Sequence, residues 1–152
     1  MVIQKRYFIL ALVLMLVLGA GLFWFFVGGA LVQKEVEEII PAGETLKHGP
    51  FIPIDNLHKG SGTAKIIRVQ DQHYLVLENF QVTNGPDLYV YLSQNQEVIT
   101  EEDLGKFEEI SPLKGNIGNQ MYLLTSEQAE NSGSVVIWCK RFSVLFSSAM
   151  LR

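Results

Sequence analysis

The chain has 152 residues, one cysteine and a formal net charge of −4. All 16 acidic residues but only 10 of the 12 basic residues follow residue 32, so residues 33–152 have a net charge of −6. Such an acidic segment gains nothing from a phosphate backbone, which argues against nucleic acid as a partner. The single cysteine excludes an intrachain disulfide, so packing alone must hold the fold together.

The first predicted element is an apolar run from Phe8 to Val32 that contains no charged side chain. As a helix that rises about 1.5 Å per residue, the run would be roughly 37 Å long, more than the about 30 Å of a bilayer's hydrocarbon core. Lys5 and Arg6 precede it and favour a cytoplasmic N-terminus. We therefore expect a cytoplasmic segment over residues 1–6 and a transmembrane anchor over residues 7–32.

A cleavable signal peptide is the alternative interpretation of this run. The apolar region of a signal peptide is usually about 7–15 residues long and ends at small residues. Here large side chains continue beyond the first small cluster, Gly19–Gly21, and only Gly28–Ala30 offers a candidate cleavage site. An uncleaved, single-pass anchor is favoured, and it would display the C-terminal domain on the extracytoplasmic side of the cell membrane.

Residues 33–45 are predicted to form a stalk or linker. The pattern of apolar and acidic residues from Val36 to Ile40 favours one further turn of the transmembrane helix, which Pro41 would end. Residues 46–152 then remain, enough chain for one hydrophobic core and too little for two.

The remaining chain is rich in short runs of β-branched, aliphatic and aromatic residues separated by turn signals about every 8–12 residues. Asn84-Gly85-Pro86-Asp87 is the strongest turn signal, and a single helical turn is expected over 100–103. The fold class that this pattern predicts is all-β: an antiparallel β-sandwich of about seven or eight short strands, preceded by one transmembrane helix. The expected strands are 63–69, 73–77, 88–92, 106–110, 120–125, 135–140 and 141–146, with a loop over 112–119.

Cys139 is the first candidate for chemistry. In a strand running through residues 135–141, Arg141 would share the face of Cys139, and Trp138 and Lys140 would lie on the other face. Positive charge beside a thiol favours the thiolate, which a redox centre, a metal site or a nucleophile requires. The apolar surroundings favour instead a buried structural cysteine, and the residues alone leave both interpretations open.

The other candidates are weaker. His48, His58 and His73 are scattered and lack the spacing of a metal site, although folding could bring one of them to Cys139, and no Cys-x-x-Cys-His haem attachment is present. We therefore predict no metal site. Tyr89 and Tyr91 alternate on one strand face, where core packing is the natural interpretation and an electron-relay surface is the alternative. No nucleophile–base spacing supports a hydrolase, so a stand-alone enzyme is disfavoured.

Several segments, taken together, resemble the DM-thirteen domain family, which is described as a proposed electron-transfer domain. The resemblance covers roughly residues 46–152 and is most specific in two motifs, Asn-Gly-Pro-Asp and Trp-Cys-Lys-Arg-Phe. The matching segments are Gly49–Phe51, His58, Gly60–Lys65, Leu75–Phe80, Asn84–Leu92, Leu113–Tyr122 and Val135–Phe142, with Phe146 and Ala149.

The resemblance implies a β-sandwich module, often joined to membrane or extracellular domains, with a hallmark cysteine that acts in redox chemistry. That residue here is Cys139, either as a free thiol or as the holder of a group such as haem, with Trp138 packed beside it and Arg141 favouring the thiolate. The motif Asn84–Asp87 completes the candidate site, and a separate redox partner protein is expected. The alternative is a non-enzymatic, surface-displayed binding or scaffolding sandwich in which the cysteine is structural.

Overall fold

A computed structural model of the chain describes residues 2–27 and 32–152. The chain divides into two compact units, Met1–Val32 and Gln33–Arg152, and each is described by itself. The candidate cleavage site at Gly28–Ala30 lies outside the described residues.

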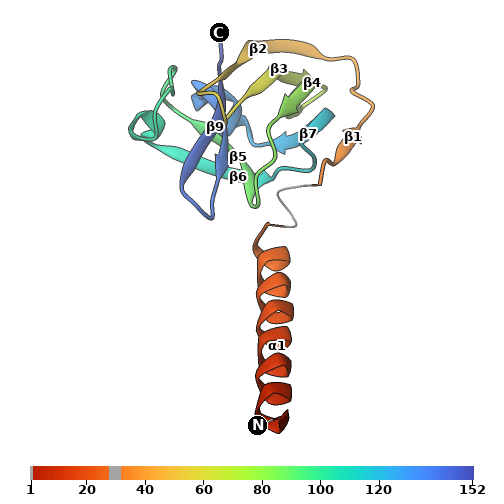
Figure 1. The fold of residues 1–152 in the computed structure, drawn as a ribbon. Helices are drawn as coiled ribbons and strands as arrows, with labels where there is room; N and C mark the ends of the chain where they lie inside the picture. Colours follow the sequence, from red (N-terminus) through yellow and green to blue (C-terminus); the bar gives the residue numbers. More distant parts are fainter. Residues whose placement is uncertain (1, 28–31) are drawn as a thin grey trace. The chain divides into compact units, whose positions relative to one another are not determined.

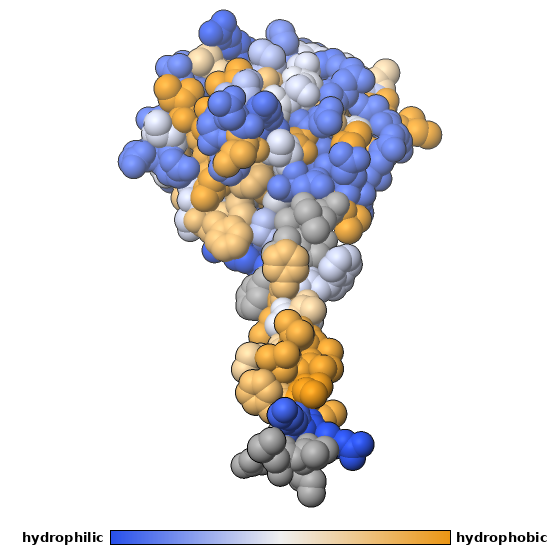
Figure 2. Space-filling model, viewed as in Figure 1, coloured by the Kyte–Doolittle hydropathy of each residue, from blue (hydrophilic) through white to orange (hydrophobic). Residues whose placement is uncertain are grey.

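The N-terminal unit is the helix α1 (Val2–Val27), which Figure 1 shows as one continuous helix. Its segment Lys5–Trp24 has the length and composition to cross a membrane. In Figure 2, orange apolar side chains cover most of the visible surface of this helix, with a blue hydrophilic patch towards its N-terminal end. The span Lys5–Trp24 is not buried. Exposure of such an apolar surface to water is unfavourable, which supports a membrane anchor. A signal sequence has the same length and composition.

The second unit confirms the predicted all-β class (Figure 1). Among the described residues, nine strands hydrogen-bond in the order β1-β7-β4-β3-β2-β9-β8-β5-β6. Two short helices, η2 (Glu102–Leu104) and α2 (Ser126–Asn131), lie in the connections. The strands are β1 (Glu35–Glu37), β2 (Glu44–Pro53), β3 (Gly60–Val69), β4 (Gln72–Val82), β5 (Leu88–Ser93), β6 (Phe107–Pro112), β7 (Ile117–Leu124), β8 (Ser134–Cys139) and β9 (Val144–Met150).

Strand β2 belongs to both halves of this sheet. Residues Glu44 to Pro50 pair with β3, and Phe51 to Pro53 pair with β9. Gly49 permits this crossing because a Cβ atom there would lie 1.7 Å from the carbonyl oxygen of Met150. The sheet therefore curls at β2, and its two halves pack face to face.

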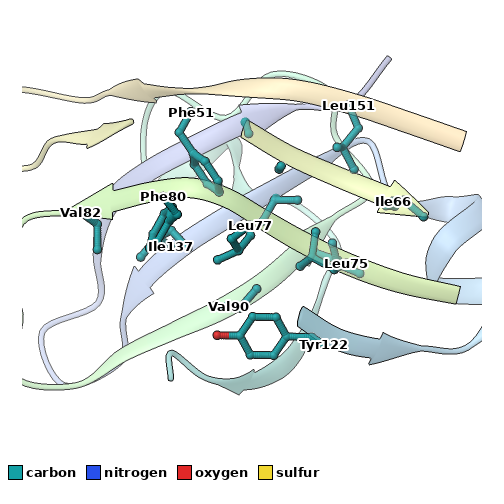
Figure 3. Close-up of a cluster of buried hydrophobic side chains, with 14 of the residues drawn as sticks. Phe51, Ile66, Leu75, Leu77, Phe80, Val82, Val90, Tyr122, Ile137 and Leu151 are labelled. Carbon is teal, nitrogen blue, oxygen red and sulfur yellow. The ribbon is translucent and has the colours of Figure 1, made fainter. Parts of the chain in front are cut away.

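The core fills the space between the two halves (Figure 3). Phe80 lies at its centre with 1% of its surface exposed, and its ring meets that of Phe51 edge to face at 4.9 Å between centroids. Aromatic pairs in this geometry contribute about 0.5–1.5 kcal/mol beyond their area burial. Side chains from both halves complete the cluster, among them Ile66, Leu75, Leu77, Val82, Val90 and Ile137.

The segment expected to be a stalk includes strand β1, which pairs in parallel with β7. The predicted further helical turn through Val36 is therefore wrong. Long-range polar contacts decide the conformation: the backbone N–H of Lys34 donates to Asn116 Oδ1 at 2.6 Å, and Lys114 Nζ donates to Glu38 Oε1 at 2.8 Å. Burial by itself would raise the pKa of Glu38, but hydrogen bonds from Lys114 and from the Met121 backbone lower it below its usual value.

A buried amide organises the turn between β6 and β7. Gln120 has no exposed surface, and its Oε1 accepts hydrogen bonds from the Gly115 backbone N–H at 3.2 Å and from the Tyr122 hydroxyl at 2.9 Å. Its Nε2 donates to the Gly115 carbonyl at 2.7 Å. Burial raises the pKa of Tyr122 to about 12, so the phenol stays a donor at neutral pH.

Candidate functional site

The two most specific motifs of the sequence lie side by side in the structure. Strand β5 begins directly after Asn84–Asp87, and β8 ends at Cys139. The strands pair antiparallel, with Leu88 opposite Cys139 and Tyr89 opposite Trp138. Because side chains alternate along a strand, Cys139 faces the core between the sheet halves, whereas the Trp138 ring lies on the outer face.

Cys139 is a free thiol with no exposed surface. Its cross-strand neighbours are Leu88 on β5 and Val144 on β9, and both pack against the main core cluster. These are the surroundings of an apolar core residue, since Cys139 is fully buried and its cross-strand neighbours are aliphatic.

Arg141 does not share a strand face with Cys139. Strand β8 ends at Cys139, and residues 140–143 form an exposed turn, so the predicted strand through Arg141 is wrong. The turn is fixed by the backbone N–H of Lys140, which donates to the Asp87 carbonyl at 2.9 Å, and by Ser143, which has a φ of 54°. A residue in the left-handed region ends strand geometry, and the sequence gives no glycine or asparagine there to signal it.

The Asn84–Asp87 loop lies over the same end of the sheet. A Cβ atom on Gly85 would come within 2.7 Å of the Leu88 side chain and 2.9 Å of the Phe146 ring, so a side chain at this position would displace one of them. The ring of His58 meets Phe146 from another loop, at 4.5 Å between centroids. Two loops that are distant in sequence therefore meet at Phe146, which belongs to the same core cluster as Cys139.

The loop that holds His58 is organised by Asp55. Its Oδ1 accepts the backbone N–H groups of Leu57 and His58 at 2.6 and 2.7 Å, and its Oδ2 lies 2.8 Å from His58 Nδ1. The hydrogen bond from the His58 ring, followed by those from the two backbone N–H groups, lowers the pKa of Asp55 to about 2.

On the outer face of β5, β8 and β6, aromatic rings form a continuous row. Tyr91 stacks on Phe107 at 4.9 Å with 7° between ring planes, and on Trp138 at 6.2 Å with 21°. The Tyr89 ring meets Tyr91 edge to face at 6.5 Å. The sequence indicated only that Tyr89 and Tyr91 share a face; the pairing of β5 with β8 adds Trp138 to it.

Polar groups border this row. The hydroxyl of Tyr91 donates to Glu109 Oε2 at 3.3 Å, and Lys140 Nζ lies 2.8 Å from the same oxygen and 4.7 Å from the centroid of the Tyr89 ring. Burial first, and the Glu109 carboxylate second, raise the pKa of Tyr91. The hydrogen bond to Glu109 raises the pKa of Lys140. Lys140, the residue after Cys139, therefore contacts the Tyr89 ring directly and Tyr91 through Glu109.

A family model described as "Electron transfer DM13" matches residues 54–151, more than half of the chain. The chain belongs to the DM13 family. No curated protein and no solved structure matches it. The matched residues begin in the loop that contains Asp55 and His58 and end with strand β9, so they include the convergence on Phe146, the aromatic row and Cys139.

A haem group does not fit Cys139 of this DM13 domain in the described conformation. The sulfur lies in a closed apolar cluster. Cys139 lines neither the cleft of about 550 Å³ beside Asn84 nor the cleft of about 450 Å³ beside His48. Within residues 2–27 and 32–152, no group of three His, Cys, Asp or Glu side chains is placed to hold a metal ion. We therefore assign no step to a prosthetic group at this cysteine.

Proposed function

We propose that this DM13 protein is a membrane-anchored electron-transfer module on the extracytoplasmic side of the cell membrane, with its redox role centred on Cys139. The proposal rests on one observation: both family motifs, separated by about fifty residues in sequence, meet in the β5–β8 pair that contains this residue. The anchor α1, with Lys5 and Arg6 before its apolar part, supports the orientation.

Burial limits the kind of chemistry that we assign to Cys139. A thiol without exposed surface can neither attack a substrate nor coordinate an external group, since both require contact with the sulfur. Electrons, however, tunnel through packed protein. In the proposed step, an oxidised partner protein takes one electron from the thiol and a thiyl radical remains. The thiol proton passes to water when the exposed turn over residues 140–143, next to Cys139, opens, and a reductant later returns an electron and a proton.

The test is voltammetry of the full-length protein in detergent. We expect one reversible couple in the wild type and its loss in Cys139→Ala. The matched control is Ser134→Ala, which removes one heavy atom from another fully buried side chain of β8 and should retain the couple. A couple that persists in Cys139→Ala, or a wild type with no couple, contradicts the proposal.

A second candidate function is a non-enzymatic binding or scaffolding module. The complete burial of Cys139 among aliphatic side chains favours it, because a structural thiol occupies such a site. The two functions differ in what they require of the surface. If Cys139→Ala supports the wild-type cellular phenotype while Asn84→Ala and Asp87→Ala abolish it, binding through the motif loop is the function; the opposite result favours electron transfer.

A further inference from the structure

We propose that the outer aromatic row of the DM13 domain is the port through which electrons pass between the protein and its partner, with Tyr91 as the relay and Glu109 as the acceptor of its proton. This inference rests on the electron-transfer function proposed above and adds a location, a route and a class of partner, a one-electron acceptor. Nothing in the family match assigns a role to these two residues.

The ring geometry provides the route. Tyr91 has 4% of its surface exposed and lies between Phe107 and Trp138, stacked on both. Phe107 is 44% exposed, so a partner that contacts this ring is one stacked ring away from Tyr91. On the other side, Trp138 is 9% exposed and directly precedes Cys139 in the chain. The row therefore leads from an exposed aromatic surface to the residue that precedes Cys139 in the chain, and the thiol lies on the opposite face of the same strand.

The hydroxyl of Tyr91 has a proton acceptor in place. A phenol that loses an electron becomes strongly acidic, and its proton must move to a base. Glu109 Oε2 lies 3.3 Å from the hydroxyl, and Lys140 holds that carboxylate through contacts of 2.8 and 3.0 Å to its two oxygens. Because burial raises the pKa of Tyr91, prior loss of the proton is disfavoured, and the electron and the proton leave together.

The step balances with named reactants. A one-electron acceptor takes an electron from Tyr91, the phenolic proton moves to Glu109, and the products are a neutral tyrosyl radical, a protonated carboxyl and the reduced acceptor. When Cys139 refills the hole through Trp138, it supplies the electron, Glu109 returns the proton to Tyr91, and the thiol proton leaves through the opening of the turn over residues 140–143, as proposed above.

Cross-strand packing alone accounts for part of this arrangement. Aromatic pairs on neighbouring strands stabilise sheets whatever their function. Packing does not require a carboxylate on the phenol, since the solvent-exposed pair of Glu109 and Lys140 adds little to stability. The relay is distinguished from packing by kinetics that depend on Glu109.

The experiment uses the full-length protein in detergent and tris(bipyridine)ruthenium(III), generated by a light flash, as the one-electron oxidant. Transient absorption and electron paramagnetic resonance follow the tyrosyl radical. We expect the wild type to form the radical and Tyr91→Phe, which keeps the stacked ring, to lose most of it. Glu109→Gln should slow its formation roughly 10-fold, less than the 10²–10⁴ of an ideally placed base because the 3.3 Å hydrogen bond is long.

The control is Tyr74→Phe, which removes another tyrosine hydroxyl, one bonded to Gln72 and remote from the row, and should leave yield and rate unchanged. An unchanged yield in Tyr91→Phe, or an unchanged rate in Glu109→Gln, overturns the relay. A Cys139→Ala variant separates the two proposals. If both proposals hold, Cys139→Ala lengthens the lifetime of the tyrosyl radical, because the thiol no longer refills it. If only the function centred on the thiol fails, the radical still forms and its rate of formation still depends on Glu109, but Cys139→Ala leaves its lifetime unchanged. If only the relay fails, the voltammetric couple of Cys139 persists without a radical at Tyr91.

Discussion

Replacing Cys139 by serine should destabilise the domain more than replacing it by alanine. The two variants differ only in a hydroxyl group. The thiol is fully buried in a cluster of aliphatic and aromatic side chains, and its cross-strand neighbours Leu88 and Val144 offer no side-chain hydrogen-bond partner. A cysteine behaves as a small apolar side chain in such a site, whereas a serine brings a polar group that needs a partner.

The expected magnitudes follow from the burial. Alanine loses the sulfur atom and leaves a cavity of about one methyl group, which costs about 1 kcal/mol. Serine leaves a smaller cavity but buries an unpaired hydroxyl, which costs about 1–3 kcal/mol in proteins, in addition to the lost apolar contact. We expect serine to be less stable than alanine by about 1–2 kcal/mol, or roughly 3–10 °C in Tm for a domain of this size.

The assay is thermal unfolding of the full-length protein in detergent, followed by near-ultraviolet circular dichroism, to which the buried aromatic rings contribute. Arg141→Ala is the control, because its side chain is exposed in the turn after β8 and should change stability by no more than about 0.5 kcal/mol. A serine variant as stable as the wild type, or more stable than the alanine variant, would falsify the reasoning, since it would mean that the site is polar or open to water.

Three further outcomes are expected. Nuclear magnetic resonance should show Asp55 titrating near pH 2; because its pKa is lowered on folding, its bonds to His58 should hold above about pH 4 and be lost as the pH falls towards 2, and a midpoint near the usual 3.8 would contradict the contacts seen. Gln120→Leu leaves three buried hydrogen-bonding groups without their partner and should lower the free energy of unfolding by about 2–4 kcal/mol, measured by urea denaturation. A decrease of less than about 1 kcal/mol would refute this prediction. Lys114→Met removes a hydrogen bond that lowers the pKa of Glu38, so Glu38 should become protonated, and β1 should detach, at a higher pH than in the wild type. Hydrogen exchange should therefore show loss of amide protection in β1 beginning at a higher pH. An unchanged exchange profile would show that the ion pair does not hold β1.

Local pattern predicted the elements whose structure depends on neighbours in sequence. The apolar run of α1 and the strands over 63–69 and 73–77 were expected from composition and alternation, and they are present in α1, β3 and β4, of which β3 and β4 pair antiparallel. The short helix α2 was missed although its signal was there: Thr125 and Gln128 form a capping box, a pattern that can be found in the sequence.

The apolar helix, the β-rich domain and the two motifs that carry the family resemblance could be predicted from the residues alone, since hydrophobic run length, alternation and turn residues are local properties. Three features became known only from the folded chain: the burial of Cys139, the exposed turn that contains Arg141, and the position of Glu109 beside the hydroxyl of Tyr91. These outcomes depend on which strands pair and in which register, and strand pairing is selected by the free energy of packing side chains that are far apart in the chain, which no short stretch of sequence specifies.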